Sequence, residues 1–193
     1  MFEVKVHNYA FRKALAYIRN KRGRNESENI KQILENTIHQ KLSTRSPYLP
    51  SYYPLKSFVI FLQIINSRLG EDKMIIAKKT NRYHDIGFYL YTGPEVADSP
   101  YHYLDPHKPL FEVVTEFYNN LQSPSGIFKD CGTAMSKKDS KVETIWKGCC
   151  EYSELFFYLE GVYAGMIKES ATDGVLSAKK EGDAFIFEVE LLD

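Results

Sequence analysis

Apolar positions recur every three or four residues through much of residues 1–122, which is the spacing of one buried helix face. Two stretches between these runs, 43–54 and 91–108, are rich in proline, glycine and polar residues and predict loops. Residues 1–6 alternate weakly and predict a short strand. The apolar runs themselves predict helices over residues 9–22, 28–42, 54–69, 109–121 and, with a weaker pattern, 71–90.

The pattern changes after residue 123. Residues 127–135 and 141–146 alternate between apolar and polar on either side of a polar connection, as the strands of a hairpin do. Residues 174–179 and 185–192 predict two further strands around a turn at 181–183. Between the two pairs, a long helix is predicted from Glu151, with one apolar face made of Tyr152, Leu155, Phe156, Leu159, Val162, Tyr163 and Met166.

This order of elements predicts an α+β fold in which a helical layer packs on one face of a four-stranded antiparallel sheet. The chain has 193 residues, which is enough for one domain with a substantial core and short for two. We therefore expect a single domain over 1–193. Residues 1–122 are its mainly helical half, and 123–193 supply the hairpin, the long helix and the last two strands.

Two glycines lie one turn apart on the apolar face of the long helix, at Gly161 and Gly165. A glycine inside a helix costs about 1 kcal/mol relative to alanine. Their placement predicts that another backbone or a ligand approaches this face very closely. Tight packing on the sheet is the simpler of the two interpretations.

Aromatic residues are abundant, at 14% of the chain, with 14 Tyr and 12 Phe. Such residues wall apolar pockets, and they are also good core filler, so both interpretations stay open. A hydrophobic small molecule held between the long helix, the helical layer and the sheet would be walled by Trp146, Tyr152, Phe156, Leu159, Gly161, Tyr163 and Phe185.

Charge and composition exclude several classes of protein. The net charge is zero and the pI about 7, which argues against a basic nucleic-acid-binding face. No apolar run approaches the roughly 20 residues of a membrane span, and no signal peptide opens the sequence. Three cysteines, two of them adjacent, do not form a secreted disulfide framework. We expect a cytoplasmic protein.

The cysteines are the residues with the clearest chemistry. Cys149 and Cys150 precede the long helix, whose dipole would lower the pKa of a thiol at its N-terminus, and Cys131 lies in the preceding hairpin. If the three thiols met, an acidic or histidine side chain could complete a zinc site; buried free cysteines are the alternative. The sequence contains no phosphate-binding glycine loop, nucleophile elbow or paired His-Glu zinc motif, so an enzymatic role is disfavoured.

The C-terminal third resembles the 4-vinyl-reductase (V4R) domain. The resemblance rests on Leu159-Glu160-Gly161, then Gly182-Asp183, then the strand Phe185-Ile186-Phe187-Glu188-Val189, and it covers residues from about 127 to the end. That domain belongs to a superfamily with the core subunits of the TRAPP tethering complex and the haem–nitric-oxide-binding domains, which implies the same α+β fold. Some V4R relatives carry a zinc site with cysteines around the Gly-Asp turn, and this sequence has none there.

The resemblance leaves three roles open. The first is a sensory or regulatory domain that binds a hydrophobic small molecule. The second is a dimeric scaffold of the tethering type, with residues 54–69 at the dimer interface. The third is an enzyme or accessory protein of tetrapyrrole metabolism, or a haem-binding variant with an axial ligand among His7, His39, His84, His102 and His107.

Overall fold

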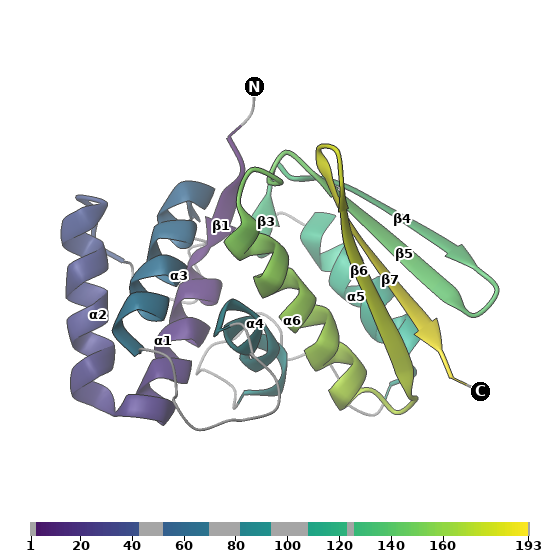
Figure 1. The fold of residues 1–193 in the computed structure, drawn as a ribbon, viewed down its shortest axis with the longest axis horizontal. Coiled ribbons are helices and arrows are strands. Elements are labelled where there is room, and N and C mark those ends of the chain that lie inside the picture. Colours follow the sequence, from purple (N-terminus) through teal and green to yellow (C-terminus); the bar gives the residue numbers. More distant parts are fainter. Residues whose placement is uncertain (1–2, 43–51, 70–81, 94–107, 123–125, 193) are drawn as a thin grey trace.

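The computed structural model describes residues 3–42, 52–69, 82–93, 108–122 and 126–192. Its strands and helices follow one another in an order that separates a helical half from a sheet half (Figure 1). The helices are α1 (Asn8–Arg22), α2 (Arg24–Thr37), α3 (Leu55–Leu69), α4 (Arg82–Thr92), α5 (Leu110–Gln122) and α6 (Ser153–Glu169). The strands are β1 (Lys5–His7), β2 (Tyr52–Pro54), β3 (Phe128–Lys129), β4 (Gly132–Lys138), β5 (Lys141–Lys147), β6 (Gly174–Glu181) and β7 (Ala184–Leu191).

The larger sheet has the strand order β4-β5-β7-β6, and every neighbouring pair is antiparallel. Its register places Thr144 opposite Phe187 and Trp146 opposite Phe185. Because successive side chains of a strand point to opposite faces, these positions share one face of the sheet. That face is buried along β5 and β7, whereas the alternating positions are more exposed. The predicted four-stranded antiparallel sheet is therefore confirmed.

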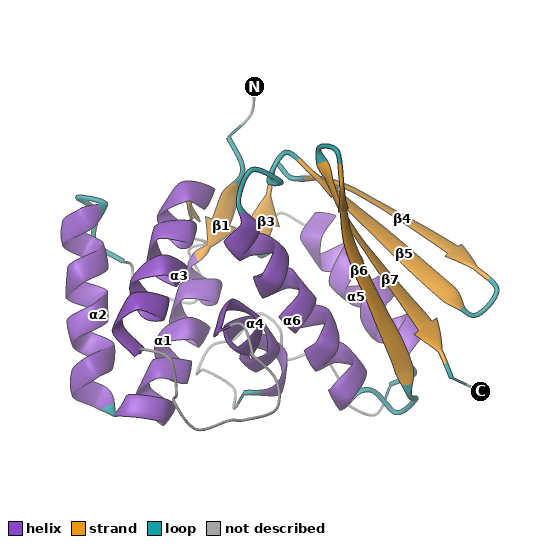
Figure 2. Ribbon diagram, in the orientation of Figure 1, coloured by secondary structure: helices purple, strands orange, loops and turns teal. Residues whose placement is uncertain are grey.

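The helices that the structure describes all lie on this inner face of the sheet (Figure 2). α6 packs its aromatic side chains on β7, and α5 places Phe117 near Trp146 of β5. Helices α1 to α4 lie on the far side of α6, with α4 crossing it in close contact (Figure 1). The predicted helical layer on one face of the sheet is confirmed. Among the described helices, none has both the length and the apolar character that crossing a bilayer requires.

The predicted strand over residues 127–135 is wrong as a single element. Asp130 adopts a left-handed conformation, with φ 62°, and separates two short strands that belong to different sheets. β3 pairs with β1, which also pairs with β2, in a small sheet of order β2-β1-β3. Only β4 joins the larger sheet. Alternation of apolar residues could not reveal this change, because both segments continue the same pattern.

The helical half differs from the prediction mainly at the ends of its elements. α2 begins at Arg24 and ends at Thr37, so it is shifted towards the N-terminus relative to 28–42. The N-cap of α1 is His7, whose Nδ1 atom accepts a hydrogen bond from the backbone N–H of Tyr9 at 3.2 Å. In the 71–90 region the structure places α4 at Arg82–Thr92, so the predicted loop at 91–108 begins too early. The predictions for residues 43–51, 70–81 and 94–107 lie outside the described residues.

α3 is the central helix of this half, as its apolar pattern predicts. Phe58, Phe61 and Ile65 are fully buried within the chain. The Phe11 ring of α1 packs against both phenylalanine rings, at centroid distances of 5.0 Å and 5.5 Å. The Phe58 ring also meets the Tyr158 ring of α6 edge to face at 5.0 Å, so α3 connects the outer helices to α6.

Candidate functional site

The space between α5, α6 and the sheet is filled by an aromatic core. Tyr163 and Phe187 stack with ring centroids 4.8 Å apart, and the Phe156 ring lies 5.6 Å from Phe187. Apart from Phe156, every ring of this group is almost fully buried. Offset-stacked and edge-to-face pairs at these distances are the favoured arrangements of aromatic rings. We use the name aromatic core for Phe117, Trp146, Phe156, Tyr163, Phe185 and Phe187.

A short hydrogen-bond network lies inside the aromatic core. The Trp146 Nε1–H group donates to the Tyr163 hydroxyl at 3.1 Å, and the Tyr163 and Thr144 hydroxyls are 2.6 Å apart. Thr144 in turn donates to the backbone carbonyl of Phe187 at 3.4 Å. Burial raises the pKa of Tyr163 to about 12, so its hydroxyl stays protonated at neutral pH. An apolar interior with a few convergent polar groups is the usual chemistry of a small-molecule site.

The structure separates the predicted wall residues into two groups. Trp146, Tyr163 and Phe185 belong to the buried part of the aromatic core, and Phe156 reaches it from a half-buried position on α6. Tyr152 is half-buried at the N-cap of α6, and Leu159 is fully buried within the helix. Gly161 faces α4, on the other side of α6 from the sheet. Sequence reasoning missed Thr144, Phe117 and Phe187, although Thr144 and Phe187 lie at the inward positions of predicted strands.

The glycines of α6 lie against the backbone of α4. A Cβ atom on Gly161 would overlap the carbonyl oxygen of His84, and one on Gly165 would lie 2.9 Å from the carbonyl oxygen of Phe88. Gly87 of α4 makes the reciprocal contact, because a Cβ atom there would overlap the carbonyl oxygen of Tyr158. The predicted close approach of another backbone is confirmed, and the backbone is that of a helix. No ligand of appreciable size fits between these two helices while they remain in contact.

The cysteines lie where the β4–β5 ladder ends and the chain turns towards α6. The Cys131 and Cys149 Sγ atoms are 3.7 Å apart, whereas the Cys150 thiol donates to the carbonyl oxygen of Trp146 at 3.3 Å. The hydrogen bond with Cys131, together with burial, raises the pKa of Cys149, the opposite of the lowering expected at a helix N-terminus. Within the described ranges, no group of three His, Cys, Asp or Glu side chains is placed to hold one metal ion.

A second set of buried polar atoms lies where α4, α5 and α6 meet. The Tyr91 hydroxyl and the Glu116 Oε2 atom are buried without a hydrogen-bond partner in the described part of the chain. The other oxygen of Glu116 pairs with the Lys108 ammonium. Burial, with the charges of Glu116 and Glu169, raises the pKa of Tyr91. Among the described residues, the Tyr91 hydroxyl therefore lacks the hydrogen bonds that the buried Tyr163 hydroxyl makes with Trp146 and Thr144.

The outer face of the sheet carries a hollow of about 460 Å³ near the β4–β5 turn. Its lining is charged: the Lys141 ammonium lies 2.9 Å from a carboxylate oxygen of Glu188 and 3.2 Å from one of Glu190. This hollow lies on the opposite face of the sheet from Tyr163. It suits a polar species better than a hydrophobic one. The residues that line it are Ser136, Lys138, Asp139, Ser140, Lys141, Glu143 and Glu188.

Solved structures of H-NOX proteins have the same fold. A triple mutant of an H-NOX protein from S. oneidensis in the Fe(II) ligation state aligns with a TM-score of 0.63 and 15% identity, over 96% of this chain and 96% of that one. An H-NOX protein from S. oneidensis in the Fe(II)NO ligation state gives a TM-score of 0.60 and 15% identity, over 96% of this chain and 99% of that one. Unliganded Fe(II) H-NOX from K. algicida gives 0.59 and 12%, over 97% of both chains. At these identities the likeness shows the fold alone.

Sequence comparison adds nothing to this structural likeness. No model of a protein family matches the chain, and no curated protein does either. The expected α+β fold is confirmed by the likeness to these solved structures. The narrower resemblance to V4R domains stays a prediction.

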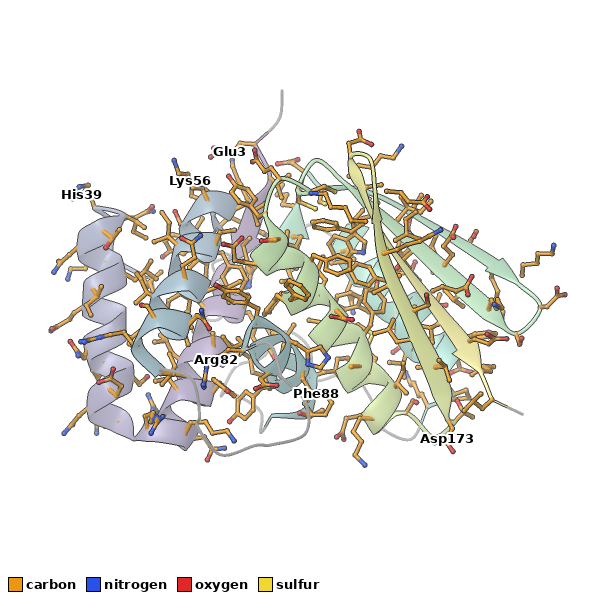
Figure 3. All side chains as sticks on the ribbon, in the orientation of Figure 1. Glu3, His39, Lys56, Arg82, Phe88 and Asp173 are labelled. Atoms are coloured by element: carbon orange, nitrogen blue, oxygen red, sulfur yellow. The ribbon has the colours of Figure 1, made fainter. Side chains whose placement is uncertain are left out.

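Haem is the group that an H-NOX fold implies, and the described histidines do not fit it in the aromatic core. The Nδ1 atom of His7 is used as the cap of α1. His39 lies at the end of α2, on the far side of the helical half from the sheet (Figure 3). The His84 Nδ1 atom lies 4.0 Å from a carboxylate oxygen of Asp85, and its ring stacks on Phe88. His102 and His107 lie outside the described residues.

Proposed function

We propose that this chain is a sensory or regulatory domain that binds a small hydrophobic molecule, taken up between α5, α6 and the sheet. The observation that carries the proposal is the hydrogen-bond network of Trp146, Tyr163 and Thr144, buried inside a core that is otherwise aromatic. Its geometry suits an apolar ligand with one hydroxyl or carbonyl group. The fold supports the same proposal, because the similar H-NOX structures include ligand-bound states.

Entry of a ligand requires a ring of the aromatic core to move, since the rings are in direct contact. Phe156 is the best candidate. Its side chain is half-buried, and its ring stacks on Phe187 and meets Phe185 edge to face at 5.3 Å. Rotation of Phe156 towards solvent would open a path to the Tyr163 hydroxyl from the N-terminal part of α6. The expected ligand therefore replaces the Phe156 ring against Phe187.

The proposal can be tested with Trp146, the single tryptophan of the chain. Toluene, benzyl alcohol and palmitate are titrated while the emission of this buried indole is followed. We expect a saturable change with at least one probe. Tyr163→Phe should weaken binding of benzyl alcohol by about threefold to tenfold, the usual value of one hydrogen bond, and leave toluene binding unchanged. Toluene thus serves as the matched control for the hydroxyl group.

Two outcomes would contradict the proposal. One is the absence of a saturable change in Trp146 emission with all three probes. The other is an equal loss of toluene and benzyl alcohol binding in Tyr163→Phe, because this would show that the hydroxyl affects packing and not the ligand. A Lys141→Ala variant at the charged outer hollow should bind all three probes like the wild type.

A further inference from the structure

Cys131 and Cys149 form a pair of thiols that the proposed ligand site does not use. Both are free, and their Sγ atoms lie 3.7 Å apart, about 1.7 Å more than the length of a disulfide bond. The last pair of the β4–β5 ladder is Gly132 opposite Lys147. Cys131 directly precedes Gly132, and Cys149 lies two residues after Lys147. The antiparallel ladder therefore holds the two backbones side by side at the point where the thiols meet.

We propose that Cys131 and Cys149 are a redox-active pair, in which a peroxide oxidises Cys131 and Cys149 then closes a reversible disulfide. The two thiols differ in exposure, and this difference assigns their roles. Cys131 is half-buried at the end of the edge strand β4, whereas the exposed fraction of Cys149 is 1%. A small oxidant in solvent therefore meets Cys131 first.

The reaction balances with a peroxide as the only oxidant. The Cys131 thiolate attacks one oxygen of hydrogen peroxide, an S–O bond forms, the O–O bond breaks, and hydroxide leaves to become water with the proton that the thiol has lost. The Cys149 sulfur then attacks the Cys131 sulfur. The S–S bond forms, the S–O bond breaks, and the departing hydroxide takes the proton of the Cys149 thiol as a second molecule of water. Each sulfur gives up one electron in total, and a dithiol reductant reverses the reaction by exchange.

Cys149 is a better partner for Cys131 than Cys150 is. The Cys150 thiol donates to the carbonyl oxygen of Trp146 at 3.3 Å, whereas the Cys131 thiol is directed at the Cys149 sulfur. The backbone carbonyl of Cys150 accepts a hydrogen bond of 2.6 Å from the Lys180 ammonium on β6, which fixes the segment in place. A disulfide between the adjacent residues 149 and 150 would need a local rearrangement of this segment, whereas the Cys131–Cys149 pair needs only the two sulfur atoms to close their gap.

The disulfide would connect two parts of the fold. Cys131 precedes the edge strand of the larger sheet, and Cys149 lies in the short segment between β5 and α6, which begins at Ser153. Closing the loop over residues 131–149 restricts the unfolded chain, so the oxidised protein should have a higher Tm, by about 5 °C. The same bond would tie the segment that leads into α6 to the edge of the sheet.

The test compares the wild type with Cys131→Ser, Cys149→Ser, Cys149→Ala and Cys150→Ser. Each protein is treated with hydrogen peroxide, the remaining thiols are blocked, and intact mass and cross-linked peptides are measured without reduction. We expect the wild type and Cys150→Ser to lose the mass of two hydrogen atoms and to yield a peptide that links residues 131 and 149. The variants of Cys131 and Cys149 should form no intramolecular disulfide, and dithiothreitol should restore the wild-type mass.

The results that would overturn the proposal are equally specific. One is accumulation of sulfinic acid on Cys131 with no disulfide in the wild type. A second is a disulfide that survives in Cys149→Ser and Cys149→Ala by using Cys150. A third is zinc released in proportion to oxidation, which would make the cysteines a metal site. Circular dichroism of each variant before treatment separates a loss of folding from a loss of the disulfide.

Discussion

The two tyrosines at 163 and 91 show how the partners of a buried hydroxyl decide its effect on stability. The Tyr163 hydroxyl has two partners, Trp146 and Thr144, inside the aromatic core. The Tyr91 hydroxyl and the Glu116 Oε2 atom are buried without a hydrogen-bond partner among the residues that the structure describes. Removing a hydrogen-bonded hydroxyl leaves its partners without a hydrogen bond, which destabilises the fold. Removing a buried hydroxyl that makes no hydrogen bond instead removes a desolvation penalty that the folded protein already carries.

Replacing each tyrosine with phenylalanine tests this difference directly. Tyr163→Phe should lower the free energy of unfolding by about 1–3 kcal/mol, because the Trp146 N–H group loses its acceptor. Tyr91→Phe is the matched control, and it should leave the free energy of unfolding unchanged or raise it slightly. Urea unfolding followed by circular dichroism measures both. Equal destabilisation by the two changes would refute the account of the network.

Titration of the His7 ring makes the free energy of unfolding depend on pH. Its Nδ1 atom must be unprotonated to accept the N–H group of Tyr9. Burial and, to a smaller degree, the charge of Arg12 lower its pKa below the ordinary value of 6.5. The unfolded chain therefore binds a proton more readily than the folded chain. The stabilisation by His7 is fully present above pH 6.5 and is lost as the pH falls through the lowered pKa of the folded state.

The variant His7→Asn keeps a capping side chain and removes the titrating ring. We expect the free energy of unfolding of the wild type to decrease from about pH 8 to pH 5 more steeply than that of His7→Asn. Urea titrations at several pH values measure the two slopes. Parallel slopes would mean that the His7 cap makes no contribution that depends on pH.

At the scale of elements, α4 and α6 pack with their backbones in direct contact. Gly87, Gly161 and Gly165 each lie where a Cβ atom would overlap or crowd the facing helix. Sequence reasoning anticipated half of this contact. It expected a close neighbour at Gly161 and Gly165, but favoured the sheet as that neighbour. Spacing within one helix cannot identify the partner helix.

Gly161→Ala tests the contact between the two helices. The added Cβ atom would overlap the His84 carbonyl and force α4 away, so we expect the free energy of unfolding to fall by about 2 kcal/mol or more despite the better helix propensity of alanine. Gly132→Ala is the control, because a Cβ atom there would meet the Lys147 Cβ atom at an ordinary 3.5 Å. Thermal unfolding of both variants gives the comparison. A Gly161→Ala variant as stable as Gly132→Ala would contradict the close approach.

The spacing of apolar residues predicted the structure best where one helical or strand period continues along the whole element. They predicted α6, the β6–β7 pair and the antiparallel sheet, because burial of one face repeats along each element. They failed at Asp130, where a single left-handed residue separates two strands of different sheets, and at His7, whose ring acts as a cap. Neither the left-handed conformation of Asp130 nor the capping by His7 changes the pattern of apolar residues. Four of the six residues of the aromatic core were among the predicted wall residues, whereas Phe117 of α5 and Phe187 of β7 were not. The position of α5 depends on tertiary packing, which the apolar pattern does not contain.

At the scale of the whole molecule, the proposed binding of a small molecule rests on the fold and on the packing beside the sheet. The H-NOX fold extends over nearly the whole chain. The space next to the sheet is aromatic and holds one buried polar network, formed by Trp146, Tyr163 and Thr144. Our proposal of an organic ligand rests on this combination of fold and interior.

The most direct measurement is a comparison of native and denatured mass spectra of the freshly purified protein. The account predicts excess mass in the native spectrum that is lost on denaturation and belongs to a hydrophobic organic molecule. Tyr163→Phe, with the network removed, should retain less of it. A native spectrum that shows only the chain, alone or as an empty oligomer, together with no response of Trp146 to the probes, would contradict the central claim.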